Sequence, residues 1–179
     1  MKNLKGTFTA IVTPFSEGKV DVVSFEKLLK QQLDAGIDGF VINGTTAESP
    51  VLNEKEKQSI FEIARKFTGG KGTLIMGTGS NDTAKTIEDS QKAEKLGADA
   101  VLVVVPYYNK PPQRGLYQHF KKVAESIAIP TILYNVPGRT ITSLQTDTIK
   151  ALSEIKGIRG IKEASGKIDF ATEDRKSVV

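Results

Sequence analysis

A lysine interrupts an apolar pattern in the segment "GIRGIKEASG", residues 157–166. Ile158, Ile161 and Ala164 predict a short buried segment, in which the ammonium group of Lys162 would lose much of its hydration. Burial favours the neutral amine, which is the form that attacks a carbonyl carbon. Lys162 is therefore a candidate Schiff-base nucleophile. The alternative is a lysine whose charge reaches water at the rim of the fold, and the spacing alone leaves both interpretations open.

Side chains that could support Schiff-base chemistry follow other apolar segments. An iminium acidifies the neighbouring carbon, so that an enamine forms and attacks an aldehyde. Threonine and tyrosine hydroxyls can relay protons, an arginine can hold a carboxylate, and the backbone N–H groups of the "GTT" segment suit a second carboxylate. Each residue also has a structural interpretation, as a helix cap, a packed strand end or a solvated loop side chain. The candidates are Thr45, Thr46, Tyr107, Tyr108, Tyr134 and Arg139.

The elements that must position these side chains alternate along the chain. Six apolar, β-branched segments are separated by five segments of helical period, which predicts parallel βαβ units and the α/β class. The candidate side chains all lie at or just beyond the carboxyl ends of the predicted strands. The strands are predicted within residues 8–15, 39–46, 72–80, 100–108, 131–138 and 158–165, and the helices within 22–36, 53–67, 81–97, 113–127 and 143–157.

Residues that favour helix ends support these boundaries. Asn53 and Asn81 precede two predicted helices, where a side-chain oxygen can accept a hydrogen bond from the first turn. Gly36, Gly97 and Gly157 follow three predicted helices, where a left-handed residue often closes the last turn.

The pattern favours a barrel over an open, doubly wound sheet. A doubly wound sheet usually has a glycine-rich phosphate loop after its first strand, whereas "TAIVTPFSEGKVD" contains no such motif. The later "GTGSND" segment is too short a glycine signal to assign a nucleotide, and it predicts a tight turn. The even spacing of the units favours a TIM (β/α)8 barrel, in which the carboxyl ends of the strands share one site.

Composition excludes several other kinds of function. Cysteine is absent, and the single histidine, His119, has no second histidine with which to share a metal, so we expect a solvated or hydrogen-bonded structural histidine and no metal site. The net charge is +4, but the lysines and arginines are interspersed with acidic residues along the predicted helices. This distribution disfavours nucleic-acid binding. The apolar run "AVLVVV" is too short to cross a membrane. The N-terminal segment lacks the features of a secretory signal, and we expect a cytoplasmic location.

Four segments resemble the signatures of the 4-hydroxy-tetrahydrodipicolinate synthase (dihydrodipicolinate synthase) family, over about residues 4–166: "GTTAES", "PYYNKPPQRGLYQHF", "YNVPGRT" and "GIKEASG". The resemblance implies a lyase of the class I aldolase type that condenses pyruvate with L-aspartate 4-semialdehyde to give 4-hydroxy-tetrahydrodipicolinate, in diaminopimelate and lysine biosynthesis. It implies no cofactor, because pyruvate is bound covalently as the substrate. N-acetylneuraminate lyase and related pyruvate aldolases share the lysine and the tyrosine, but "PGRT" favours the synthase.

The resemblance also implies a role for each candidate residue. Lys162 matches the Schiff-base lysine, and the proton relay is matched by Thr45, Tyr108 and Tyr134. Thr45 and Thr46 match the site of the pyruvate carboxylate, and Arg139 matches the residue that receives the carboxylate of the aldehyde substrate. In this family the tyrosine that matches Tyr108 enters the site of a neighbouring subunit. A homo-oligomer is therefore expected, commonly a dimer of dimers, that is, a homotetramer.

A feedback site for lysine at the subunit interface is the last feature that the resemblance implies. Ser49, Asn81 and Tyr107 match it. Lysine-inhibited members often carry two histidines and a glutamate at three other positions. This chain has Glu54, Lys57 and Lys85 there. A cation at position 85 would repel the ammonium group of lysine, so we expect weak or absent inhibition.

The chain contains only six of the eight expected βα units. A TIM barrel typically needs ~250 residues, whereas this sequence has 179. The prediction is an incomplete barrel over residues 1–166, followed by a truncated tail, residues 167–179, that enters a sixth helix. An inactive truncated fragment is therefore an alternative to an active lyase.

Overall fold

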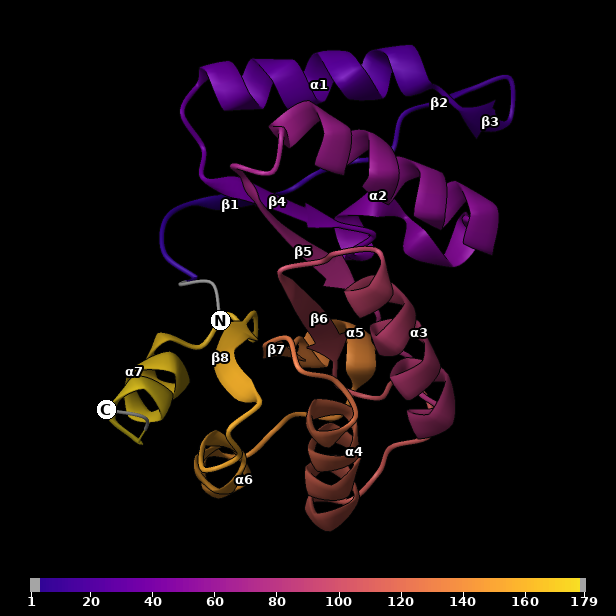
Figure 1. Ribbon diagram of the computed structural model, residues 1–179. Coiled ribbons are helices and arrows are strands. Elements are labelled where there is room, and N and C mark those ends of the chain that lie inside the picture. The colour runs from indigo at the N-terminus through magenta and orange to yellow at the C-terminus, as the bar shows by residue number, and fades with distance from the viewer. Residues whose placement is uncertain (1–3, 178–179) are drawn as a thin grey trace. The chain divides into compact units, whose positions relative to one another are not determined.

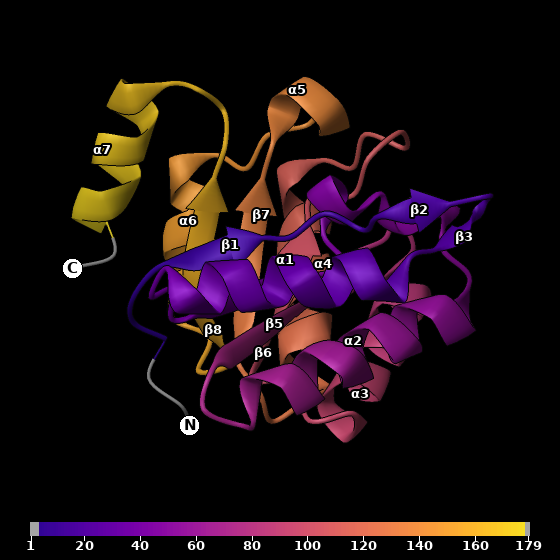
Figure 2. The ribbon, with the colours of Figure 1, turned by 90° about the horizontal axis from the view of Figure 1, so that it is seen from above.

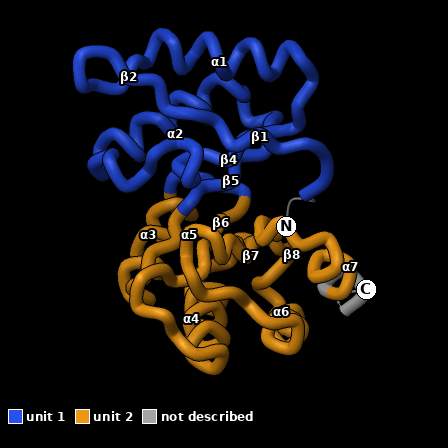
Figure 3. The backbone as a smooth tube through the Cα atoms, turned by 180° about the vertical axis from the view of Figure 1, so that it is seen from behind, with its two compact units in different colours: residues 1–77, 96–99 blue, residues 78–95, 100–179 orange. Residues whose placement is uncertain are grey.

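The chain divides into two compact units in the computed structural model, which describes the backbone of residues 4–177 and the side chains of residues 4–173. Unit 1 comprises residues 1–77 and 96–99, and unit 2 comprises residues 78–95 and 100–179 (Figure 3). Each unit contains three parallel strands, and the helix that follows the last strand of unit 1 belongs to unit 2. No helix in the described part of the chain has the length and apolarity needed to cross a membrane.

Unit 1 contains a parallel sheet in the order β1-β4-β5, with the helices α1 and α2 packed beside each other (Figure 1). The apolar faces of the two helices bury Phe25, Leu29 and Phe61 completely, which explains their helical period. A two-stranded hairpin of β2 and β3, which the sequence analysis does not predict, follows β1. The elements are β1 (Phe8–Ala10), β2 (Phe15–Ser16), β3 (Lys19–Val20), α1 (Val22–Asp34), β4 (Gly39–Ile42), the 3-10 turns η1 (Thr45–Ala47) and η2 (Ser49–Val51), α2 (Glu54–Thr68) and β5 (Thr73–Gly77).

Unit 2 contains a second set of parallel strands in the order β6-β7-β8. Its helices contact one another in sequence, α3 with α4, α4 with α6, and α6 with α7. Figure 2 shows β7 and β8 side by side, with α7 following β8. The elements are α3 (Thr83–Lys95), β6 (Ala100–Val104), α4 (Gln113–Glu125), β7 (Thr131–Asn135), α5 (Pro137–Thr140), α6 (Thr146–Ser153), β8 (Ile158–Glu163) and α7 (Ile168–Ser177).

The N-cap prediction is confirmed at one asparagine and wrong at the other. Asn53 caps α2 in a capping box, because its side chain accepts from the N–H of Glu56 while the Glu56 carboxylate accepts from the N–H of Asn53. Asn81 does not cap α3. The residue directly before α3 is Asp82, and its carboxylate accepts a hydrogen bond from the N–H of Ala84 at 2.9 Å.

The predicted glycine caps are also partly confirmed. Gly36 and Gly97 have φ values of 84° and 85°, in the left-handed region. Gly157 does not have a positive φ. A Cβ atom there would lie 2.8 Å from the carbonyl oxygen of Ala124, so Gly157 is suited to close packing against α4 rather than to a left-handed turn.

Candidate active site

Lys162 lies late in β8, opposite Tyr134 of β7. The strands are parallel, and these two residues are partners in register. The Lys162 Nζ atom lies 4.3 Å from the centroid of the Tyr134 ring, within the range at which the negative ring face attracts a cation. Tyr134 itself is only 7% exposed. Strand pairing therefore brings two of the predicted site residues into contact.

Lys162 is partly exposed, which corrects the prediction that its segment is buried. Of the apolar residues around it, Ile158 is buried, Ile161 is half-buried and Ala164 is exposed. Among the described residues, β8 pairs with β7 alone. One edge of the strand is therefore uncovered by a neighbouring strand, and the lysine amine keeps part of its hydration.

A hydrogen-bonded cluster on the next register pair supports the two strands. Asn135 is fully buried, and its Nδ2 donates to Oε2 of Glu163 at 2.7 Å. The other oxygen of Glu163 accepts from the N–H of Ser165 at 2.6 Å. The Asn135 side-chain oxygen accepts from the N–H of Leu144 at 3.0 Å. The sequence pattern does not indicate this cluster, although Asn135 falls inside the segment "YNVPGRT" and Glu163 inside the segment "GIKEASG".

Tyr107 and Tyr108 follow β6, as predicted, and both are exposed. Tyr108 is 85% exposed and has a φ of 73°, a left-handed conformation that is uncommon for a bulky residue. Strain of this kind typically costs ~1–3 kcal/mol and is concentrated at functional sites. The structure therefore presents the Tyr108 ring to the surface on a strained backbone.

Arg139 lies in the short helix α5, directly after β7, and its side chain is exposed. It forms no salt bridge with a described side chain. The helix is anchored by Thr140, whose hydroxyl donates to the carbonyls of Val136 at 3.1 Å and Thr142 at 2.7 Å. The guanidinium group therefore projects from a fixed turn and is free to bind a carboxylate.

Thr45 and Thr46 lie in η1 of unit 1, after β4, and both are exposed. The turn begins after Gly44, and the N–H of Ala47 donates to the Gly44 carbonyl at 3.1 Å. The convergence of these threonines with the unit 2 residues stays a prediction.

Two of the three residues of the predicted feedback site share a partner in unit 2. Asn109 donates from its side chain to the carbonyl of Asn81 at 2.9 Å, and from its backbone N–H to the carbonyl of Tyr107 at 2.9 Å. Ser49 lies in η2 of unit 1. Lys85 forms an ion pair with Asp89 of the same helix at 2.7 Å.

His119 is the hydrogen-bonded structural histidine that the sequence predicts. It is 4% exposed, and its Nδ1 lies 2.9 Å from the Thr83 hydroxyl. Burial lowers the pKa of His119 from 6.5 to about 4, against a smaller opposing effect of Asp82. The described residues contain no cluster of three side chains that could hold a metal ion.

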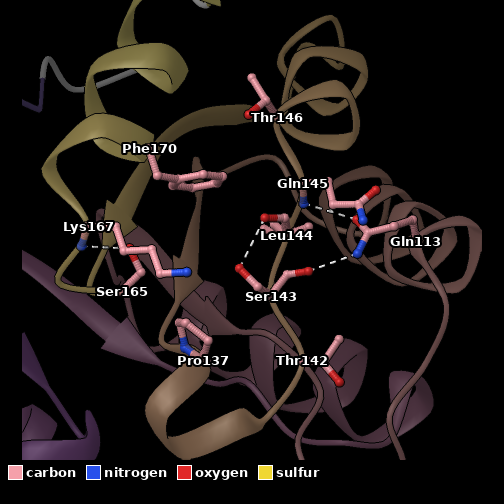
Figure 4. A pocket seen from close by; sticks show the side chains of 10 residues that line it. All are labelled: Gln113, Pro137, Thr142, Ser143, Leu144, Gln145, Thr146, Ser165, Lys167 and Phe170. Carbon is pink, nitrogen blue, oxygen red and sulfur yellow. Dashed lines mark hydrogen bonds between the residues drawn. The ribbon is translucent and has the colours of Figure 1, made fainter.

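A hollow of about 500 Å³ is lined by residues that include Leu144 and Ser165 (Figure 4). The N–H groups of these two residues donate to Asn135 and Glu163. Ser143 and Ser165 line it, the ring of Phe170 forms part of its wall, and the side chain of Lys167 points into it. Neither Lys162 nor Tyr134 is a lining residue. The hollow is therefore separate from the lysine and tyrosine pair.

Comparison with known proteins assigns the chain to a family. The model of the dihydrodipicolinate synthetase family matches residues 3–179. The chain belongs to this family. A 4-hydroxy-tetrahydrodipicolinate synthase from Bdellovibrio bacteriovorus is 70% identical over 173 residues, which are 97% of this chain and 59% of that relative. The chain thus spans less than two thirds of the length of the curated relative.

Solved structures of dihydrodipicolinate synthases share the fold. The chloride-inhibited enzyme from Acinetobacter baumannii, complexed with pyruvate, is 42% identical with a TM-score of 0.96, over 98% of this chain and 61% of that chain. A protein described as the first monomeric dihydrodipicolinate synthase variant is 42% identical with a TM-score of 0.95, over 97% of this chain and 58% of that chain. The predicted fold, about six βα units of a TIM barrel, is confirmed for this family member.

Proposed function

We propose that the chain condenses pyruvate with L-aspartate 4-semialdehyde through a Schiff base on Lys162, as a lyase of lysine and diaminopimelate biosynthesis. The observation that carries the proposal is the position of the Lys162 Nζ atom, 4.3 Å from the centre of the Tyr134 ring. Membership of the dihydrodipicolinate synthetase family supports the choice of substrates. The relative that is 70% identical is named for this activity.

The chemistry begins when the neutral amine of Lys162 attacks the keto carbon of pyruvate and the resulting carbinolamine loses water. The product is an iminium, a cation at the same nitrogen that lies over the Tyr134 ring. The ring face that attracts an ammonium also attracts this cation, so the pair stabilises the intermediate. The iminium draws electrons from the methyl group, which loses a proton and becomes the nucleophilic carbon of an enamine.

The enamine then forms a bond to the aldehyde carbon of the second substrate. The amino group of that substrate displaces the Lys162 amine, which closes the ring and frees the enzyme. The net reaction joins the two substrates and releases one water, so it requires no oxidant, reductant or cofactor. The proposed proton relay is Tyr134, Thr45 and Tyr108.

The two carboxylates of the substrates need separate anchors. The backbone N–H groups and hydroxyls of Thr45 and Thr46 suit the small carboxylate of pyruvate. The exposed guanidinium of Arg139 suits the carboxylate of the aldehyde, because its planar fork can donate two parallel hydrogen bonds. We assign these two roles as part of the proposal.

The proposed working state is a homo-oligomer, at least a dimer and commonly a dimer of dimers, in the cytoplasm. Tyr108 is 85% exposed on a strained turn, which suits a ring that enters the site of a second copy. A monomeric variant exists among the similar structures, so the oligomeric state needs its own measurement. Sedimentation with and without Tyr108→Ala would supply it.

The test of the proposal is the intact mass of the chain after incubation with pyruvate and borohydride. We expect a mass gain of one reduced pyruvate, lost in Lys162→Ala and retained in Lys167→Ala, the matched control on an exposed lysine five residues away. No adduct on folded chain, or an adduct that survives Lys162→Ala, would contradict the proposal. Turnover with L-aspartate 4-semialdehyde then separates a synthase from an inactive chain, and turnover with other aldehydes reveals an aldolase of the N-acetylneuraminate lyase type.

A further inference from the structure

The pairing of β7 with β8 changes register part-way along the strands. Thr131 pairs with Ile158, but Ile132 pairs with Gly160, so Arg159 is an extra residue on β8. Such a bulge re-aims the side chains that follow it. Without the extra residue, the register of Thr131 would place Tyr134 opposite Ile161. The bulge therefore decides that the residue opposite Tyr134 is Lys162.

Consecutive strand residues point to opposite faces of the sheet, so the register pairs divide between two faces. Tyr134 and Lys162 share one face, where the amine lies over the ring. Asn135 and Glu163 share the opposite face, where their side chains hydrogen-bond at 2.7 Å. A shift of β8 by one residue against β7 would move each of its side chains to the opposite face of the sheet. The hydrogen bond between Asn135 and Glu163 on one face therefore constrains the contact between Tyr134 and Lys162 on the other.

Several hydrogen bonds fix the positions of Asn135 and Glu163, which follow the bulge along the paired strands. Asn135 is fully buried, and its backbone carbonyl accepts from the N–H of Ala164 at 2.8 Å. Its side-chain oxygen accepts from the N–H of Leu144, which ties β7 to the loop before α6. The Glu163 carboxylate accepts from both Asn135 and the N–H of Ser165. In the bonds to Glu163, Leu144 and Ser165 the donor and the acceptor are therefore defined.

We propose that Asn135 and Glu163 are positioning residues, whose hydrogen bond holds β8 in the shifted register that sets the amine of Lys162 over the ring of Tyr134. Neither side chain touches the reacting atoms, and both act from the opposite face of the strands. The proposal rests on the proposed function only where it assigns this contact a role in Schiff-base formation.

The donor and acceptor pattern provides a test by exchange. In Glu163→Gln the introduced amide has only one oxygen, so it cannot accept from both Asn135 and Ser165. Its NH₂ group then faces one of these two N–H donors. In Asn135→Asp two carboxylates meet. In the double variant the introduced carboxylate accepts from Leu144 and from the introduced amide, whose oxygen accepts from Ser165. The bond between positions 135 and 163 is then restored with its direction reversed, and the bonds from the N–H groups of Leu144 and Ser165 are kept. The Ser143 hydroxyl, which lies 3.2 Å from Nδ2 and 3.3 Å from Oδ1 of Asn135 in the parent chain, can donate to the introduced carboxylate.

The first readout is the rate of the pyruvate adduct at saturating pyruvate, trapped with borohydride. We expect each single variant to slow the adduct about 10- to 100-fold, as is typical when a supporting residue lets a reactive group move. The double variant should recover to within about threefold of the parent chain. Ser90→Ala is the matched control, because it removes a buried hydrogen bond to Thr78 in the same unit, and its rate should be unchanged at equal folded fraction.

The second readout needs no pyruvate. The ring of Tyr134 should shift the proton signals of the Lys162 ε-methylene group upfield, and Lys162→Arg assigns them by their loss. We expect this shift to disappear in each single variant and to return in the double variant. A shift that persists in folded single variants, or a double variant that recovers neither readout, would overturn the positioning role.

The two readouts separate the two proposals. A parent chain that forms no adduct, while the ring shift is lost in the single variants and restored in the double variant, sinks the proposed function and supports the positioning role. An adduct that forms equally fast in all folded variants supports the function and overturns the positioning role. Where a single variant fails to fold, the folding and ring shift of the double variant decide the outcome.

Discussion

Acidification should destabilise the chain through His119, which lies in α4 at 4% exposure. Its Nδ1 is paired with the Thr83 hydroxyl, whereas its Nε2 has no hydrogen-bond partner among the described residues. The doubly protonated ring would be a buried charge whose Nε2–H has no acceptor among the described residues. This is why burial lowers the pKa of His119 from 6.5 to about 4, with Asp82 opposing the shift only in part.

The sign of the effect follows from the two pKa values. Between pH 6.5 and about 4 the unfolded chain binds a proton at His119 that the folded chain does not. The stabilisation is therefore complete above about pH 6.5 and is lost as the pH falls towards 4. At pH 4.5 the two values imply a loss of about 2 to 3 kcal/mol, a large part of the stability of a small domain.

His119→Asn provides the comparison, because an amide can keep the hydrogen bond to Thr83 but does not titrate. At pH 7 its free energy of unfolding should be lower than that of the parent chain, since the edge contact with Phe120 is lost. The informative quantity is the change between pH 7 and pH 4.5 in urea denaturation. Carboxylates titrate in both proteins and cancel, so the parent chain should lose about 2 to 3 kcal/mol more than the variant.

An independent measurement uses the proton spectrum of the imidazole ring. His119 is the only histidine in the sequence, so its ring signals need no assignment by mutation. They should not begin to titrate until the pH is well below 6. A normal titration near pH 6.5 in the folded chain, or equal pH dependence of the parent and His119→Asn, would refute the reasoning.

Two further predictions concern Tyr108 and the response to lysine. Tyr108→Gly should raise the free energy of unfolding by roughly 1 kcal/mol, because the φ of 73° strains a tyrosine and removal of the 85% exposed ring costs little packing. Tyr108→Phe is the control, since it leaves the backbone strain unchanged. A denaturation midpoint for Tyr108→Gly at or below that of Tyr108→Phe would contradict the explanation. In an active enzyme that carries Glu54, Lys57 and Lys85, lysine at millimolar concentration should inhibit turnover weakly or not at all. Lys85→Glu should increase this inhibition, because it removes the charge that repels the lysine ammonium group. Strong inhibition with Lys85 in place would show that this repulsion does not govern lysine binding.

Periodicity in the sequence was sufficient to predict the six strands of the parallel order and the five longer helices between them, α1, α2, α3, α4 and α6, but not the four-residue helix α5. Each predicted strand segment contains an observed strand. Apolar β-branched runs and helical periods extend over only a few residues, so they can be recognised in the sequence alone. The N-cap at Asn53 was predictable because capping depends on neighbouring residues, although the capping box with Glu56 was not predicted and the same reasoning failed at Asn81. The short hairpin of β2 and β3 has too few residues to produce such a pattern and was not predicted.

The candidate site was predictable as a set of residue types, but only partly as an arrangement. Sequence placed Lys162 and Tyr134 at the ends of neighbouring strands. It could not reveal the bulge at Arg159, because a change of register depends on how two distant segments pair. The cluster of Asn135, Glu163 and Ser165 was missed for a similar reason, since its bonds join strands that are far apart in sequence.

The sequence by itself therefore determined the elements, the family signatures and the chemical types available at the strand ends, which are properties of short segments. Only the tertiary structure decided that Lys162 is half-buried rather than buried, that its amine lies over the Tyr134 ring, and that His119 is buried. Exposure and contact depend on which segments cover each side chain. That coverage is set by packing across the fold, and no local pattern of residues contains it.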